Sequence, residues 1–340
     1  MSGITFGGCT NSPRVAYTST MTKRRLTEQQ TRRIQAQRSA SSQDDASELG
    51  QPGVVIARYG KQALIESSSG DRLLCHLRAH LESPVAGDNV VWLPTEEAGV
   101  LDALVTRQNV LERPDAQGRL RPVAANIDLM LIVFAPEPAP QANLIDRYLV
   151  AAENMGVEAA LVLNKADLLE PDSDLKHHLA RYTALGYRTL VTHHNLPDAS
   201  DLMALIGKDT LVLVGQSGVG KSSLIKRLLP EASIRVGELS EVADKGRHTT
   251  TTAELFHLPG GGRLIDSPGV RDFGLTHVSQ EAVANGFREF WPFLGDCRFR
   301  DCRHQSEPGC ALAGAVENGD ISAERFHSFQ QIADSLKEGD

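Results

Sequence analysis

The chain has 340 residues, of which 41% are hydrophobic and 23% are charged, and its formal net charge is −8 at pH 7. This composition is that of a globular protein with room for two or three domains, and no apolar run approaches the roughly 20 residues that span a bilayer. Because the first residues lack a basic start and an apolar core, we expect a cytoplasmic protein. Its five cysteines should then be reduced, and a clustered set of them should bind metal rather than form disulfides.

Residues 1–50 are predicted to be a disordered basic arm and linker. Between Arg14 and Arg38 there are seven Arg or Lys residues against one acid, with few large apolar residues. Such a segment cannot bury a core. It is suited to contact RNA phosphates, and a solubilising tail is the open alternative. A natural start at Met21 would make residues 1–20 an upstream addition.

Residues 51–110 are predicted to form a small all-β barrel. Turn residues separate five short apolar or alternating runs, a pattern typical of strands. A barrel of five strands has the size of an OB-fold, and we interpret it as an RNA-binding domain. The five runs are Val54–Tyr59, Ala63–Ser67, Arg72–Leu77, Asn89–Leu93 and Val100–Val105.

Residues 111–278 are predicted to form an α/β domain, in which the α/β pattern begins after a polar connector, Arg107–Ala125. Buried strands alternate with amphipathic helices, which indicates a parallel sheet covered on both faces. From 279 to 340 the pattern is mostly helical. The strands are Leu129–Phe134, Ala159–Leu163, Thr189–Thr192, Leu211–Val214 and Arg263–Ile265, and the helices are Asn143–Met155, Asp174–Leu185, Asp198–Leu205 and Lys221–Leu229.

A phosphate-binding P-loop follows the strand at 211–214. Its glycines let successive backbone N–H groups point at phosphate oxygens, and the next helix adds its positive end. Lys221 is predicted to bind the β- and γ-phosphates as a catalytic residue, and the Ser222 hydroxyl to bind Mg²⁺. The motif residues are Gly215, Gln216, Ser217, Gly218, Val219, Gly220, Lys221 and Ser222, followed by Ser223.

A guanine-specificity motif follows the strand at 159–163, where ligands bind in α/β sheets. It consists of Asn164, Lys165, Ala166 and Asp167. The Asp167 carboxylate can accept from guanine N1–H and the exocyclic amine, which adenine does not offer, and such a site can discriminate by about 10⁴. A helix start with an ordinary Asn and Asp is the alternative for the motif alone.

Two further segments fit the switches of a GTPase. Asp266-Ser-Pro-Gly269 matches D-x-x-G, with Asp266 binding Mg²⁺ through water and the Gly269 amide contacting the γ-phosphate; a plain turn is the alternative. In Gly246–Thr252, a threonine should complete the Mg²⁺ shell, with Thr250 as the candidate between Thr249 and Thr251. A polar loop without a metal role is the alternative there.

The order of these motifs is permuted. In ordinary GTPases the N-K-x-D motif comes last, but here it precedes the P-loop. The permutation makes Asp266–Gly269 lead directly into the C-terminal domain, so we infer that γ-phosphate contact and domain position are linked. Val270 stands where many GTPases carry a water-orienting Gln, which predicts slow intrinsic hydrolysis. His248 is the candidate catalytic replacement, and a surface histidine is the alternative.

The C-terminal region contains a candidate structural zinc site. Cys297, Cys302, His304 and Cys310 supply three thiolates and one imidazole within 14 residues. Four such ligands match a closed tetrahedral site that leaves no position for water, so we do not expect this metal to be catalytic. Reduced cysteines without metal are the alternative. Four basic residues lie nearby in the sequence and could bind RNA phosphates: Arg298, Arg300, Arg303 and Lys337. A solvated basic surface without a partner is the alternative.

The barrel, the permuted motifs and the Cys-x₄-Cys-x-His-x₅-Cys spacing together resemble the RsgA (YjeQ) family of circularly permuted GTPases. The resemblance runs from about Gly53 to the C-terminus. The matching segments are Gly87-Asp-Asn-Val-Val-Trp92, Asn143-Leu-Ile-Asp-Arg-Tyr-Leu149, Asn164-Lys-Ala-Asp167, Gly215–Ser223, His248-Thr-Thr-Thr251 and Asp266-Ser-Pro-Gly-Val-Arg271.

The resemblance implies an OB-fold, a permuted GTPase domain with Mg²⁺ and GTP or GDP, and a domain with one zinc ion. It further implies a monomer without membrane contact that binds 16S rRNA in the 30S subunit and acts late in its maturation, with hydrolysis stimulated by the subunit. Two departures are a fifth motif that reads Thr192-His193-His194 and residues 1–20, for which we recognise no counterpart in the family. A P-loop ATPase and an RNA-binding scaffold with a vestigial site are the competing hypotheses.

Overall fold

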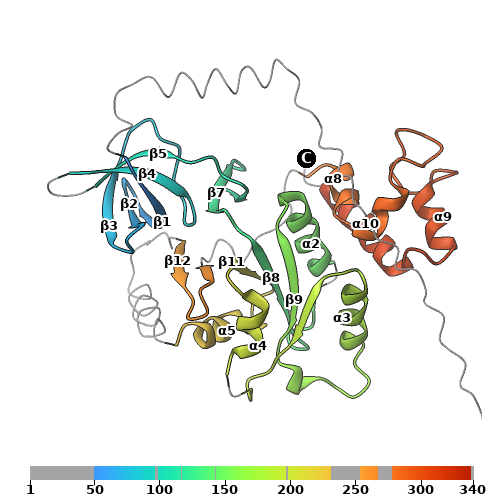
Figure 1. Cartoon of the computed structure of the whole chain (residues 1–340). Helices are drawn as coiled ribbons and strands as arrows, with labels where there is room; N and C mark the ends of the chain where they lie inside the picture. The colour runs from blue at the N-terminus through green and yellow to red at the C-terminus, as the bar shows by residue number, and fades with distance from the viewer. Residues whose placement is uncertain are drawn as a thin grey trace, which may run out of the picture. The chain divides into compact units, whose positions relative to one another are not determined.

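The computed structural model describes residues 50–95, 99–115, 117–141, 143–196, 198–230, 253–266 and 278–337. Within them, a closed barrel is followed by a parallel sheet with helices on both faces and then by a group of helices (Figure 1). Among these residues, no helix is both long enough and apolar enough to cross a bilayer. The predicted basic arm lies outside the described residues.

The five predicted barrel strands are confirmed. They are β1 (Gln51–Tyr59), β2 (Gln62–Ser67), β3 (Arg72–Leu77), β4 (Asn89–Pro94) and β5 (Gly99–Leu104). Their order is β1-β2-β3-β5-β4, and β4 pairs back with β1, which closes the barrel as an OB-type fold requires. Val55, Ile65, Cys75 and Trp92 fill its interior.

A buried ion pair lies at the start of β4. Asp88, which is fully buried, accepts from Arg107 Nε at 2.7 Å and from Val85 N at 2.8 Å. Gly87 beside it has φ 90°, and a Cβ there would lie 2.2 Å from Ala125 O. Only glycine fits such an approach, which explains the Gly-Asp pair in the sequence.

The prediction of a polar connector at 107–125 is wrong. The chain there forms a hairpin of β6 (Val110–Pro114) and β7 (Leu120–Ala125). The hairpin is a separate two-stranded sheet, and most of its residues do not face a core. Its sequence therefore contains charged and proline residues and lacks the alternation of apolar and polar residues that marks a strand. Only one end, at Leu111 and Ala124, packs into the main core.

The sheet of the α/β region contains the five predicted strands and one more. Its order is β10-β9-β8-β11-β13-β12, parallel except for β12, and β12 pairs with β1 of the barrel. The bounds are β8 Leu129–Phe134, β9 Glu158–Leu163, β10 Arg188–Val191, β11 Thr210–Val214, β12 Glu254–His257 and β13 Arg263–Asp266.

Helices cover both faces of this sheet, as predicted. One core lies under α2 (Leu144–Met155) and α3 (Leu175–Ala184). The other lies under α4 (Ser200–Ile206) and α5 (Lys221–Leu228). Because β8, β9 and β11 lie between these layers, nearly all their residues are buried, which accounts for their uninterrupted apolar sequence.

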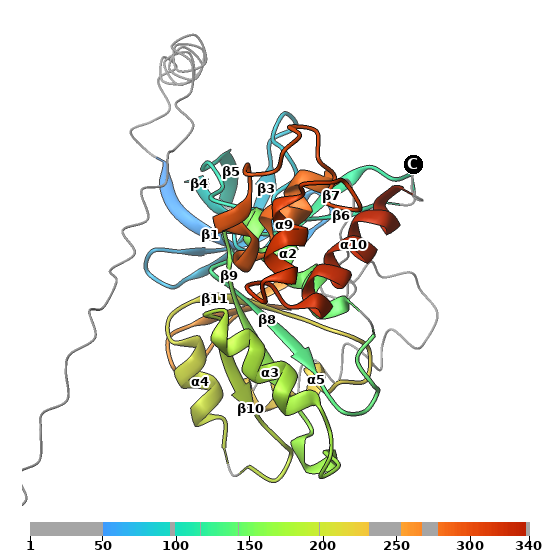
Figure 2. The ribbon, with the colours of Figure 1, turned by 90° about the vertical axis from the view of Figure 1, so that its right-hand side faces the viewer.

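The C-terminal helices have a core of their own and pack on α2 (Figure 2). They are α8 (Gln280–Asn285), the 3₁₀ helix η2 (Arg288–Phe293), α9 (Ala311–Glu317) and α10 (Ala323–Lys337). Phe287, Phe290 and Phe329 are fully buried at the centre, with ring centroids 4.8–5.8 Å apart. Val150 and Ala151 of α2 join this core.

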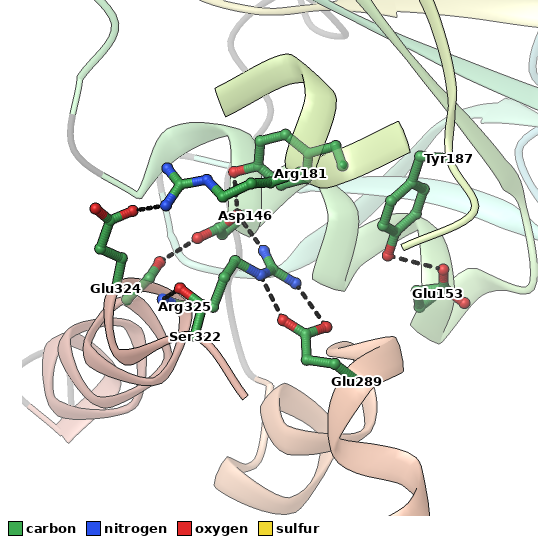
Figure 3. A network of polar contacts seen from close by, with 10 residues as sticks. Asp146, Glu153, Arg181, Tyr187, Glu289, Ser322, Glu324 and Arg325 are labelled. Atoms are coloured by element: carbon green, nitrogen blue, oxygen red, sulfur yellow. Dashed lines mark hydrogen bonds and ion pairs between the residues drawn. The ribbon is translucent and has the colours of Figure 1, made fainter. Parts of the chain in front are cut away.

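A buried polar network joins α2 to these helices (Figure 3). Arg325 of α10 binds the Glu289 carboxylate with Nε at 2.6 Å and Nη2 at 3.2 Å, and it also binds Asp146 of α2. Asp146 accepts further from Ser328 and, at 2.6 Å, from the Tyr182 hydroxyl of α3. Every charge in the network therefore has partners, as burial demands.

Candidate functional site

The P-loop connects β11 to α5, as its sequence predicts. Gly215 has φ 138° and Gly220 has φ 98°, conformations that L side chains rarely adopt. A Cβ on Gly215 would lie 2.1 Å from Val133 O, and one on Gly220 would lie 2.3 Å from Asn164 Nδ2. The two glycines thus let the loop pass closely between β8 and the guanine-specificity motif.

The residues predicted to bind phosphate and metal lie at the ends of neighbouring strands. Lys221 begins α5, and its buried side chain donates to Gly215 O and, at 2.8 Å, to Gln216 O. Ser222 follows it on the helix, and Asp266 ends β13, which is parallel to β11. A hydroxyl and a carboxylate are oxygen ligands of the kind that Mg²⁺ prefers.

Each polar side chain of the predicted guanine-specificity motif contacts a different neighbouring loop. Asn164 Nδ2 donates to Val219 O of the P-loop at 2.9 Å. Lys165 Nζ donates to Glu137 O at 2.8 Å. Asp167 Oδ2 lies 3.1 Å from His194 Nδ1. The motif, which spans Asn164–Asp167 and includes Ala166, therefore ties together three segments that are far apart in sequence.

The segment after β8, residues 135–141, belongs to this site, although no sequence motif indicated it. Gln141 N donates to the side chain of Gln216 in the P-loop at 3.2 Å. A Cβ on Gly218 would lie 3.3 Å from Pro138 Cδ. With the Lys165 contact, this segment bridges the P-loop and the guanine-specificity motif. Its contacts use mostly backbone atoms, which carry no sequence signal.

The structure brings together most but not all of the predicted nucleotide-site residues. The motif at 164–167 and the P-loop at 215–223 follow strands of one sheet, and Asp266 is the last residue of a third strand, so all three lie at the carboxyl ends of its strands. His248, Thr250 and its neighbours Thr249 and Thr251, Gly269 and Val270 lie outside the described residues. Their predicted roles stay predictions.

The four predicted zinc ligands converge. The ligand atoms of Cys297, Cys302, His304 and Cys310 all lie within 4.8 Å of one another. His304 Nδ1 lies 3.5 Å from the sulfur of Cys297 and 3.5 Å from that of Cys310. A tetrahedral ion with Zn–S near 2.3 Å and Zn–N near 2.0 Å places such atoms about 3.5 Å apart, so the cluster is consistent with a zinc site.

The chemistry of this Cys₃His cluster also fits a cation. Burial raises the pKa of the Cys302 thiol to about 12 and raises the pKa of Cys310 as well. Without a bound cation these groups are neutral thiols at neutral pH, and a metal ion would stabilise them as thiolates. Burial lowers the pKa of His304, which keeps a lone pair on its imidazole for a metal.

Glu307 shapes the ligand loop, and sequence reasoning missed it. Its carboxylate accepts from the backbone N–H of Gln305 at 2.9 Å, Arg303 at 3.0 Å and Ser306 at 3.2 Å. These bonds, of which the one from Gln305 has the largest effect, lower the pKa of Glu307 to about 2, so its carboxylate is charged at neutral pH. The carboxylate holds the turn that presents His304, which has φ 55°.

Comparison with known proteins agrees with this arrangement. The RsgA GTPase family model matches residues 104–276. The small ribosomal subunit biogenesis GTPase RsgA of Chromohalobacter salexigens is 57% identical over 86% of this chain and 88% of its own length. That of Marinobacter nauticus is 49% identical over 93% of this chain and 97% of its own length.

Two solved structures share the fold. YjeQ from Thermotoga maritima has a TM-score of 0.70 at 29% identity, over 85% of this chain and 99% of its own. YloQ, described as a circularly permuted GTPase, has a TM-score of 0.69 at 26% identity, over 88% of this chain and 99% of its own. The chain therefore belongs to the RsgA family of circularly permuted GTPases and is a GTP hydrolase of small ribosomal subunit biogenesis.

Proposed function

We propose that this protein binds the 30S subunit in its GTP form, and that the subunit stimulates hydrolysis of GTP to GDP late in maturation. The observation that carries the proposal is the convergence of three motifs at the carboxyl ends of β9, β11 and β13. In the sequence, the segment that follows Asp266 connects directly to the C-terminal helices. In this proposal, a change at the γ-phosphate is transmitted through this segment.

The proposed roles follow from the chemistry of each side chain. Lys221 binds the β- and γ-phosphates, and Asp167 binds guanine. Ser222 and Thr250 bind Mg²⁺ directly, and Asp266 binds it through water. Mg²⁺ supplies charge neutralisation for the phosphates. His248 is the proposed catalytic group in place of the missing glutamine.

The proposed contacts with 16S rRNA involve the barrel and the zinc-binding region. Arg58, Lys61, Arg78 and Arg121 line a groove of about 730 Å³ between the barrel and the β6–β7 hairpin. Arg300 and Arg303 line another groove, of about 420 Å³, beside the Cys₃His cluster. Guanidinium and ammonium groups in such positions suit phosphate oxygens.

Binding of the subunit should depend on the nucleotide. A GTP analogue should tighten 30S binding relative to GDP, since a ligand shifts a conformation only through differential affinity. By reciprocity, the subunit should tighten binding of the analogue by the same factor. Sedimentation of the protein with purified 30S in each nucleotide state measures the first effect. Hydrolysis with and without 30S measures stimulation, and equal 30S affinity for both states would contradict the proposal.

Asp167→Asn should weaken GTP binding by about a hundredfold or more and should favour xanthosine triphosphate. The amide cannot accept both guanine donors, and it leaves a buried hydrogen bond unmade. Its N–H can instead donate to the 2-oxo group of xanthine. Equilibrium titration of both nucleotides checks this. Asp172→Asn, at an exposed position of the next loop, is the control, and parental GTP affinity in Asp167→Asn would refute guanine recognition there.

Purified protein should contain one zinc ion per chain. Cys302→Ser should lose it, because the site needs all four ligands, whereas Cys75→Ser in the barrel should keep it. Elemental analysis without chelator measures both. Removing the ion should loosen the C-terminal helices and leave the sheet, which has separate cores. Absence of zinc from the parent protein would rule the site out.

A further inference from the structure

We propose that His194 is a positioning residue for guanine recognition, whose imidazole N–H holds the Asp167 carboxylate in the orientation that the base requires. The inference deepens the proposed function, because it rests on Asp167 as the guanine acceptor. The sequence departs from ordinary GTPases here, at Thr192-His193-His194. The structure gives that departure a role.

The sheet places the two residues side by side. β9 and β10 are parallel neighbours, and Leu163 at the end of β9 is level with Val191 at the end of β10. Asp167 and His194 follow these two strand ends within a few residues. Their contact, at 3.1 Å between Asp167 Oδ2 and His194 Nδ1, joins the loop after β9 to the loop after β10.

The backbone fixes the His194 loop against the Asp167 loop. Thr192 N donates to Leu163 O at 2.8 Å, and Ala166 N donates to Thr192 O at 3.1 Å. Arg227 of α5 adds bonds to Thr192 Oγ1 at 3.3 Å and His193 O at 3.4 Å. Since α5 begins at Lys221, the helix of the phosphate site also supports the loop of the base site.

The chemistry of the contact defines its direction. The two atoms lie at ion-pair distance, and because a carboxylate accepts but does not donate, the proposed hydrogen bond is the one in which Nδ1 carries the proton and donates to Oδ2. The χ2 torsion of aspartate has a broad energy minimum. A hydrogen bond to one carboxylate oxygen narrows the range of χ2 angles that the side chain adopts. Each carboxylate oxygen has two lone pairs. Oδ2 can therefore accept from His194 and from guanine together, while Oδ1 accepts the second guanine donor.

The contact should matter more with nucleotide bound than without. The His194 side chain is 74% exposed and that of Asp167 is 23% exposed, and exposed pairs contribute little. A bound base removes water from this carboxylate and strengthens its remaining hydrogen bonds. The contact should therefore favour the nucleotide-bound state, and its loss should reduce affinity rather than stability.

His194→Ala should weaken binding of GDP and of a GTP analogue equally, each by about fivefold to tenfold. The base is common to both nucleotides, so KM should rise while kcat at saturating GTP stays unchanged. His194→Asn should restore affinity, because asparagine Nδ2 occupies nearly the position of histidine Nδ1. His177→Ala, at an exposed histidine of α3, is the matched control. Fluorescent nucleotide titration gives the affinities.

A double-mutant cycle with Asp167→Asn tests whether the two residues act together. His194→Ala should cost much less in the Asp167→Asn background than in the parent. An undiminished cost there, failure of His194→Asn to restore affinity, or parental affinity of His194→Ala would overturn the inference. If Asp167→Asn weakens GTP binding but His194→Ala does not, guanine recognition by Asp167 stands and only the role of His194 fails.

Discussion

Lys221→Ala should reduce subunit-stimulated GTP hydrolysis by at least about a hundredfold. A preorganised cation beside the phosphates stabilises charge in the transition state, and loss of one such group typically costs about 10²–10³ in rate. Lys221 is already held in place, because its buried ammonium donates to Gly215 O and Gln216 O. Phosphate oxygens would take over as acceptors without a large movement of the side chain.

The measurement is phosphate release at saturating 30S, with the fold checked by circular dichroism. Lys226→Ala removes an exposed cation from the same helix and should leave the rate near that of the parent. Ser222→Ala, which deletes the proposed Mg²⁺ ligand, should also abolish stimulated turnover while sparing the fold. A folded Lys221→Ala protein with parental turnover would disprove the assignment of the phosphate site.

The strands and helices were largely predictable because their signals are local. Turn residues such as Gly60 and Gly70, both with positive φ, separate the barrel strands, and uninterrupted apolar runs, buried at nearly every residue, mark β8, β9 and β11. The β6–β7 hairpin was not predictable in this way. Its two strands pair with each other rather than with the main sheet. Its outer residues are exposed, and its proline and arginine content is typical of a loop.

Individual motifs of the site were predictable, but the contacts between them were not. The P-loop glycines are required by backbone geometry within a few residues, which leaves a sequence signal. The bonds to Glu137 O and Gln141 N use backbone atoms that any residue supplies. His194 meets Asp167 only because parallel strands align two loops, and no local pattern specifies that alignment.

The role of Asp146 was equally hidden. In the sequence it is an acid in the first turn of an amphipathic helix, a favourable place for a solvated carboxylate. The structure buries it against Arg325, which lies 179 residues further along the chain. Such a pair can be recognised only when both elements are placed.

Arg325→Met should destabilise the C-terminal helices by about 3–5 kcal/mol, the usual cost of removing one partner from a buried ion pair. The arginine side chain is 8% exposed and the carboxylates of Asp146 and Glu289 are each 7% exposed. Two negative charges then face one another without their shared cation. The guanidinium also packs over the Phe287 ring at 4.3 Å, so its planar surface is lost too.

Urea unfolding and hydrogen exchange over residues 278–337 measure the loss. Arg181→Met removes the surface pair with Glu324, whose side chains are 39% and 67% exposed, and should change stability by less than about 1 kcal/mol. Adding Asp146→Asn and Glu289→Gln to Arg325→Met should recover much of the stability, because no unpaired charge is then buried. Equal effects of Arg325→Met and Arg181→Met would contradict this account of the network.

The functional result of Arg325→Met should differ from that of Lys221→Ala. The sheet keeps its own two cores, so nucleotide binding should persist. The contacts of α10 with the start of α2, at Asn143–Gln331 and Arg147–Ser335, adjoin the 135–141 segment that bridges the nucleotide motifs. Loosening α10 should therefore uncouple the C-terminal region from the nucleotide site. We expect parental GDP affinity and parental basal turnover, with loss of stimulation by 30S. Full stimulation of Arg325→Met would show that the subunit acts without the contacts between α10 and α2.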